Sequence, residues 1–177
     1  MISLEKNETI HFFMTGGTID SVYDGIRDTA VPRSHSIIPS YIGNLRLYTK
    51  TLFTEICMKD SRALSKDDMK KLCREVDKSP AKKIIITHGT YTMPDTARFL
   101  EANLKTKDKT IVLTGSMIPL EGFSPSDAGF NLGYSLSQVQ ILPKGVYVCM
   151  NGKSFSPKEV LKVLQEGRFD SIFSKKN

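Results

Sequence analysis

Two threonines directly follow glycines, and their hydroxyl groups are candidates for nucleophilic chemistry. Thr18 comes after Gly16-Gly17, and Thr90 comes after Gly89. Cleavage of an amide or ester by a hydroxyl needs a nucleophile with open backbone around it, a group that takes up its proton, and donors for the developing oxyanion. The glycines let the chain turn tightly and leave Gly17 and Gly89 open to close approach by a substrate. A second threonine is a weak base by itself, but a neighbouring lysine with a lowered pKa could relay the proton.

The elements that must position these threonines are short apolar runs. Three runs rich in Ile, Val and Phe, at residues 10–14, 84–86 and 111–113, lead into polar loops: Thr15-Gly16-Gly17-Thr18, Thr87-His88-Gly89-Thr90 and Thr114-Gly115-Ser116. Runs this short that end at glycine are typical of buried strands, and helical patterns separate them. Parallel strands bind ligands at their carboxyl edge, so we expect the three loops to converge on one site. Each loop taken alone would be an ordinary strand exit.

Strand and helix patterns alternate along the rest of the chain. Further strands are expected at residues 52–58 and 146–150, and helices after Ser65, Pro94 and Ser126 or Asp127. This alternation predicts an α/β fold, a three-layer doubly wound sheet that is mostly parallel. The whole chain, residues 1–177, is expected to form a single domain.

For two further segments the sequence predicts a loop and a helix. Residues 22–45 contain glycines and prolines with little periodicity, which favours a long loop that could act as a lid. Ser156-Pro157 is expected to open a last helix that stops at Gly167, with three residues on its apolar face: Val160, Leu161 and Leu164.

The composition limits the classes of partner. The chain carries 25 Lys and Arg against 19 Asp and Glu, a formal net charge of +6. Its densest basic stretches, residues 78–83 and 105–109, contain no aromatic side chains, so we expect solvated surface and no nucleic-acid partner. Three widely spaced cysteines favour a reducing compartment. The polar start and the lack of a long apolar stretch predict a cytoplasmic protein without a membrane partner.

The polar loops and their flanks together resemble the signature segments of a known family. The resemblance is carried by Thr15-Gly16-Gly17-Thr18-Ile19, by Thr87-His88-Gly89-Thr90 with Thr92-Met93, and by Leu113-Thr114-Gly115-Ser116-Met117 with Pro119 and Ser126-Asp127 to Asn131-Leu132. In type, order and spacing these segments are similar to those of the bacterial-type L-asparaginase and glutaminase family. The similarity covers nearly the whole chain but only the family's amino-terminal domain, which implies a short single-domain member. It also implies a homo-oligomer, either a dimer or a tetramer.

The resemblance implies roles for individual residues. Thr18 matches the primary nucleophile, Thr90 the second catalytic threonine, and Lys162 the lysine paired with that threonine. Tyr23 matches the tyrosine of a mobile loop that hydrogen-bonds the nucleophile, and Ser61 matches the serine that holds the substrate's α-carboxylate. In the implied reaction, Thr18 attacks the side-chain amide of asparagine or a related amide, ammonia leaves, and water hydrolyses the acyl-enzyme to the acid. No metal or organic cofactor is implied.

Two positions depart from the family pattern and change the expected charge of the site. Tyr91 stands where an aspartate is usual, so the carboxylate that meets the substrate's α-ammonium is absent, and a neutral phenol does not replace it. Arg62 stands where a glutamine is usual, and its guanidinium could pair bidentately with a carboxylate. We therefore expect altered substrate preference or weak activity unless another acidic residue compensates; the candidates are Asp20, Asp24, Asp60 and Glu121.

Other interpretations of these residues stay open. Lys162 could lie on the solvated face of the last helix, and Tyr23 could be an exposed loop aromatic. Asp127 and Asn131 are expected to cap and brace a helix rather than to contact substrate. Because Tyr91 removes a functional charge, a non-catalytic amino-acid-binding or regulatory protein of the same fold is the alternative function. Nucleotide binding is a weaker one, since the glycine spacing of a dinucleotide fingerprint is missing.

Overall fold

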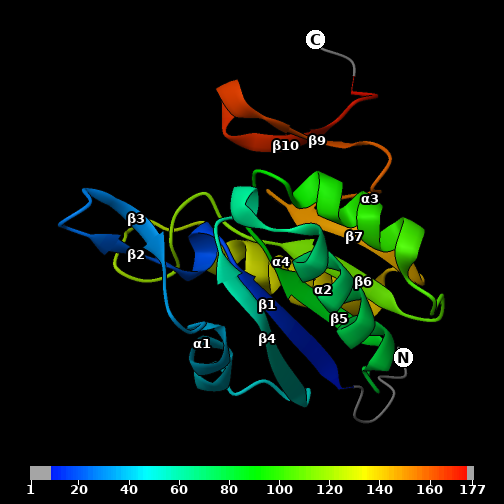
Figure 1. Ribbon diagram of the computed structural model, residues 1–177. Helices are drawn as coiled ribbons and strands as arrows, with labels where there is room; N and C mark the ends of the chain where they lie inside the picture. The colour runs from blue at the N-terminus through cyan, green and yellow to red at the C-terminus, as the bar shows by residue number, and fades with distance from the viewer. Residues whose placement is uncertain (1–8, 175–177) are drawn as a thin grey trace.

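The computed structural model describes residues 9–174, and its centre is a six-stranded sheet (Figure 1). The strands, in spatial order, are β4 (Thr51–Lys59), β1 (Ile10–Gly16), β5 (Lys83–Thr87), β6 (Thr110–Thr114), β7 (Gly145–Met150) and β8 (Lys153–Phe155). The first five run parallel, and β8 pairs antiparallel with β7 at one edge. The five parallel strands were expected from the sequence, whereas the short β8 was not.

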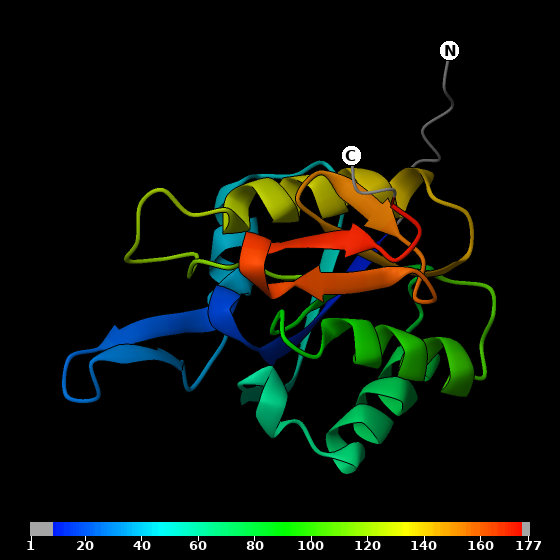
Figure 2. The ribbon, with the colours of Figure 1, turned by 90° about the horizontal axis from the view of Figure 1, so that it is seen from above.

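Helices cover both faces of the sheet, which confirms the three-layer doubly wound fold (Figures 1 and 2). On one face lie α2 (Lys66–Lys78) and α3 (Met93–Asn103), and on the other lie α1 (Ile38–Asn44) and α4 (Ala128–Ile141). In the central strand β5, Ile84 and Ile86 contact the first layer and Ile85 contacts the second, and all three are fully buried. A strand buried on both faces is a continuous apolar run, which explains why this run was recognisable. No helix within residues 9–174 is long and apolar enough to cross a membrane.

Side chains at the N-terminal ends of two helices form hydrogen bonds with backbone amides. Ser65 caps α2 as expected: its hydroxyl accepts from the Asp68 amide, while the Asp68 carboxylate accepts from the Ser65 amide. At α4, Asp127 occupies the N-cap position, but its carboxylate accepts from the amides of Met117 and Ile118. Asp127 therefore braces the long loop after β6 against the helix instead of capping the helix itself.

Residues 22–45 are more ordered than the sequence analysis expected. They form most of a hairpin of β2 (Ser21–Asp24) and β3 (Thr29–Pro32), which projects from the body of the molecule in Figure 2, and then helix α1. Buried Asp20 anchors this segment, because its carboxylate accepts from the Ser36 hydroxyl and the Ile37 amide. The expectation of a structureless loop was wrong because elements of four to seven residues are too short to show periodicity.

The prediction of a last helix between Ser156 and Gly167 is also wrong. Residues 160–171 form a second hairpin, with β9 (Val160–Val163) antiparallel to β10 (Arg168–Ser171). The apolar spacing of Val160 and Leu164 suggested a helical face, but Gly167 has a φ angle of +58° and closes the hairpin turn rather than a helix end. The β-branched Val160 and Val163 favour the extended chain.

Candidate active site

The strand order creates a topological switch point between the carboxyl ends of β1 and β5, the place where doubly wound sheets form a binding crevice. β1 lies between β4 and β5, and the chain leaves β1 toward α1 on one face but leaves β5 toward α3 on the other. In doubly wound sheets, ligands bind where the connections diverge in this way. The loop after β1 carries Thr18 and the loop after β5 carries Thr90, so both threonines come from the two loops that border this crevice.

These loops touch because neither has a side chain at the point of closest approach. A Cβ atom at Gly17 would lie 2.3 Å from the Gly89 Cα atom, and the Gly17 φ angle is +81°. A Cβ atom at Gly89 would lie 2.8 Å from Ser61 Oγ, in the loop after β4. The three loops after β1, β4 and β5 therefore meet at Gly17, Ser61 and Gly89, which we call the rim.

Ser61 is tied to the start of α3. The Thr92 hydroxyl donates to the Ser61 carbonyl at 3.0 Å, and the Thr92 amide donates to Ser61 Oγ at 3.4 Å. Ser61 is only 4% exposed. Its hydroxyl oxygen acts as the acceptor in this contact, so its own proton is available to donate.

Lys162 reaches the rim from the far end of the chain. Its Nζ donates to Thr90 Oγ1 at 2.7 Å. Burial lowers the pKa of Lys162, and the positive charge of Arg62 lowers it further, while the Asp60 carboxylate raises it. The structure thus joins the two residues that the sequence analysis paired, with Lys162 on strand β9 rather than on a helix.

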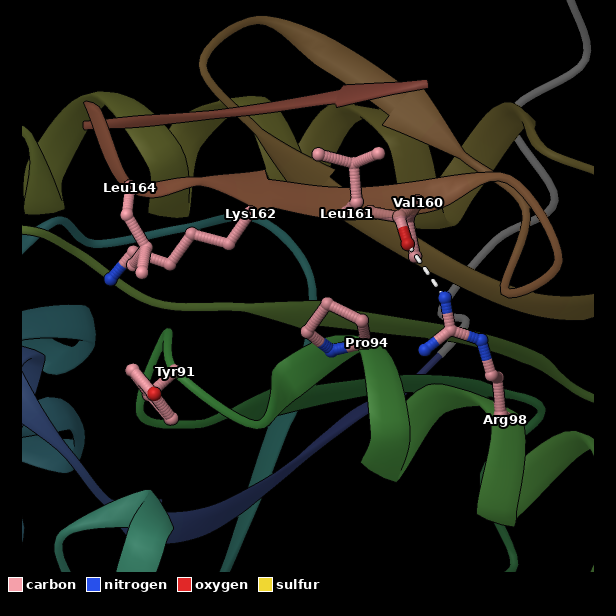
Figure 3. A pocket seen from close by; sticks show the side chains of 7 residues that line it. All are labelled: Tyr91, Pro94, Arg98, Val160, Leu161, Lys162 and Leu164. Atoms are coloured by element: carbon pink, nitrogen blue, oxygen red, sulfur yellow. Dashed lines mark hydrogen bonds between the residues drawn. The ribbon is translucent and has the colours of Figure 1, made fainter. Parts of the chain in front are cut away.

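The β9–β10 hairpin is held firmly beside α3. Val160 and Phe169 are buried in the core under α2 and α3. Arg98 Nη2 in α3 donates to the Val160 carbonyl at 2.8 Å (Figure 3), and the Phe169 amide donates to Asn151 Oδ1 at 3.0 Å. Phe169 is the residue opposite Lys162 in the hairpin. Asn151 therefore fixes the position directly across from the candidate catalytic lysine.

A cavity of about 230 Å³ opens next to this lysine, between β9 and the first turns of α3 (Figure 3). Its lining consists of Tyr91, Pro94, Arg98, Val160, Leu161, Lys162 and Leu164. In Figure 3, Lys162 extends along the hairpin above Tyr91. Tyr91 lines the cavity and is 53% exposed, so it does not pack in the core.

Arg62 forms an ion pair with Asp60, a carboxylate of the same chain. Its Nε and Nη2 donate to the two carboxylate oxygens of Asp60, both at 3.0 Å. Its guanidinium carbon also lies 5.6 Å from the centroid of the Tyr91 ring, in cation–π range. In this structure Arg62 thus pairs bidentately with Asp60, and its expected pairing with a substrate carboxylate stays a prediction. Asp60 is one of the four acidic candidates of the sequence analysis, and its pKa is lowered chiefly by the hydrogen bond from Arg62.

The other acidic candidates are engaged elsewhere. Asp20 is buried, and this burial raises its pKa to about 6 against the opposing hydrogen bonds from Ile37 and Ser36. The Asp24 carboxylate accepts from backbone amides in the turn of the β2–β3 hairpin, and Glu121 pairs with Arg33. Asp60 is therefore the candidate whose charge acts at Lys162.

Thr18 and Tyr23 are less closely linked than expected. Thr18 is half-buried and begins a 3-10 turn, Thr18–Asp20. Tyr23 lies on the β2–β3 hairpin, 53% exposed, and its hydroxyl donates to Asp28. This hydrogen bond is the main cause of the raised pKa of Tyr23. In this structure the phenol proton is therefore directed to Asp28 and not to Thr18.

Two buried polar residues, His88 and Asn131, brace the loops around the rim. Burial lowers the pKa of His88 to about 4, so the ring is neutral; it contacts the Gly89 carbonyl at 2.7 Å and the Thr96 hydroxyl at 3.0 Å. Asn131 donates to the Gly115 carbonyl and accepts from the Asn151 amide. Asn131 thus braces the loops after β6 and β7, in keeping with its expected bracing role.

Taken together, fold and site define a doubly wound α/β protein with a threonine–lysine pair at its switch point. The family model described as "Asparaginase, N-terminal" matches residues 9–176. The chain therefore belongs to the asparaginase family and corresponds to its amino-terminal domain.

Curated proteins and solved structures agree with this family. A glutaminase-asparaginase of Acinetobacter glutaminasificans is 37% identical over 109 residues, which cover 58% of this chain and 32% of the relative. The thermostable L-asparaginase from Thermococcus kodakarensis superimposes with a TM-score of 0.78 at 28% identity, over 94% of this chain and 52% of that chain. A probable cytoplasmic L-asparaginase from Campylobacter jejuni gives 0.77 at 28% identity, over 93% and 52%. The chain thus spans about a third of the curated relative and about half of the solved structures.

Proposed function

We propose that the chain hydrolyses the side-chain amide of L-asparagine or a related amide to the acid and ammonia, with Thr18 as nucleophile. The observation that carries the proposal is the 2.7 Å hydrogen bond between Lys162 Nζ and Thr90 Oγ1 at the rim. A partly buried lysine whose pKa is lowered by burial, next to a hydroxyl, suits the role of a proton acceptor. The names of the relatives, glutaminase-asparaginase and L-asparaginase, support the same class of reaction.

The proposed reaction has two halves. Thr18 Oγ1 attacks the amide carbon, the carbon–nitrogen bond breaks, and ammonia leaves with the proton that the hydroxyl gave up. Water then attacks the acyl-threonine, the bond to Thr18 breaks, and the acid is released. In our proposal the neutral amine of Lys162 accepts the proton of the attacking oxygen through Thr90 and returns it to the leaving group.

Tyr23 has a role in this scheme only if its hydroxyl leaves Asp28. Its hydrogen bond to Asp28 raises its pKa and so keeps the phenol protonated. We therefore propose Tyr23 as a group that donates to Thr18 in the substrate complex, not as a base.

Domain organisation, location in the cell and self-association are also part of the proposal. We propose that residues 1–177 act as one cytoplasmic domain that self-associates as a dimer or tetramer. Exposed apolar side chains beside the β9–β10 hairpin support self-association: Leu164, Ile172 and Phe173.

The test removes each member of the proton-relay pair. Thr90→Val and Lys162→Met should each lower the rate of ammonia release from the best amide by about 100-fold or more, because general acid–base catalysis is lost. Lys158→Met, an exposed lysine in the segment before β9, is the matched control and should retain the wild-type rate. Wild-type rates in both pair variants, or no ammonia from the wild type with any amide, would contradict the proposal.

A further inference from the structure

The charges next to Lys162 restrict the substrates that the rim can hold. The charged residues that act on Lys162 are Arg62 and Asp60. Lys162 is a neutral amine in the proposed reaction, and the charges of Arg62 and Asp60 offset each other, so these three residues leave no unpaired negative charge. A substrate ammonium group would therefore meet the Arg62 cation without a free counter-charge, whereas a substrate that carries only a carboxylate avoids this repulsion.

The carboxylate of Asp60 is already engaged by three N–H donors. Arg62 Nε and Nη2 each donate at 3.0 Å, and the Arg62 amide donates to Oδ1 at 2.8 Å. The amide contact makes Asp60 the N-cap of the short turn Ser61–Ala63, so the carboxylate also has a structural role. An incoming ammonium group would have to displace Arg62 to reach a counter-charge at this place.

Tyr91 makes the adjoining surface neutral. Its ring lies under the Arg62 guanidinium and also lines the cavity together with Pro94 and Leu164. A phenol carries no charge at neutral pH. The space next to Tyr91 therefore suits a hydrogen atom or an uncharged substituent better than an ammonium group.

We propose that the site takes a monoamide of a small dicarboxylic acid that has no free α-ammonium group, such as succinamate or an N-acylated asparagine. The inference rests on the proposed function, since it names the substrate of that same reaction. The substrate's carboxylate lies against the free hydroxyl proton of Ser61 and the charge of Arg62. Water replaces ammonia at the amide carbon, so succinamate gives succinate and ammonia.

The first experiment compares ammonia release from succinamate, N-acetyl-L-asparagine and L-asparagine by the wild-type protein. We expect kcat/KM for succinamate to exceed that for L-asparagine at least tenfold, because only asparagine places an ammonium beside Arg62 and Lys162. Equal or better turnover of L-asparagine would overturn the inference while leaving the proposed function intact.

A binding experiment separates the inference from turnover. Calorimetric titration of Thr18→Ala with succinamate and with L-asparagine measures recognition without chemistry. Tighter binding of succinamate supports the inference even if the wild type releases no ammonia, which would reject the proposed function alone. Tighter binding of L-asparagine, or binding of neither compound, would overturn the inference.

Variants at position 91 test the cause of the preference. Tyr91→Asp supplies a free carboxylate and should shift the ratio of kcat/KM values toward L-asparagine. Tyr91→Phe keeps the ring under Arg62 and adds no charge, so it should keep the wild-type preference for succinamate. If both variants shift the ratio equally, charge at this position is not the cause.

Discussion

Lys162 and Thr90 are separated by 72 residues in the chain, yet they form the contact on which the proposed chemistry depends. The pair could be named from the sequence because each residue matches a family motif. The surroundings of this pair could not be predicted. The ion pair of Arg62 with Asp60 and the stacking of Arg62 on Tyr91 depend on side-chain geometry between two loops. The electrostatics of the lysine follow from these surroundings more than from the motif itself.

The neighbours of Lys162 predict opposite shifts in a pH profile. If its neutral amine accepts the proton, the activity must rise with pH through the pKa of Lys162. Arg62 lowers this pKa and Asp60 raises it. The rising limb is the part of the pH profile in which kcat increases with pH. Arg62→Gln should therefore move this limb to higher pH, and Asp60→Asn should move it to lower pH.

The measurement is kcat against pH for the wild type and both variants at low and high salt. Both shifts should shrink at high salt, because screening weakens interactions between partly exposed charges. Shifts in the same direction for both variants would contradict the assignment of the limb to Lys162.

Among the secondary-structure elements, the β9–β10 hairpin is one of two segments for which the sequence predicted the wrong structure. The strands β1, β5 and β6 were predictable because each is buried on both faces and appears as a short run of mostly apolar residues. The hairpin has one buried residue per strand, Val160 and Phe169, and too few apolar positions to separate a strand pattern from a helical one. In an extended strand, alternate residues share a face, so Lys162 lies on the same side as Val160 and is directed toward α3 and Thr90.

Asn151 should act as a positioning residue for this hairpin. Its Oδ1 accepts from the Phe169 amide, and its φ angle is +55°. Asn151→Gly keeps the left-handed backbone but removes the acceptor, so Lys162 should lose its fixed position and kcat should fall by roughly 10- to 100-fold. Asn151→Asp keeps an acceptor oxygen and a residue type that tolerates this backbone, and it should retain most of the activity.

The readout includes the pH profile, because a purely structural role would lower the amount of folded protein without moving the rising limb. We expect that limb to move in Asn151→Gly, with KM little changed, and to return toward the wild-type position in Asn151→Asp. Equal effects of the two substitutions would show that the acceptor oxygen has no part in positioning Lys162.

At the scale of the whole molecule, the architecture was the most predictable property. The alternation of apolar runs and amphipathic helices specifies a doubly wound sheet, and the order of the strands then fixes where a crevice must lie. The β2–β3 hairpin was not predictable, since four-residue strands with exposed side chains such as Tyr23 carry no periodic signal. The exposed Leu164 lines the cavity together with Lys162, so self-association through this end of the hairpin would also change access to Lys162.

The central claim is that the hydroxyl of Thr18 forms the covalent bond to the substrate. Its most direct test is ammonia release by Thr18→Ala and Thr18→Ser, each with thermal unfolding measured alongside. We expect a loss of at least about 1,000-fold in Thr18→Ala with an unchanged unfolding midpoint, and partial activity in Thr18→Ser, which keeps a hydroxyl. Ammonia release by folded Thr18→Ala at the wild-type rate would contradict it.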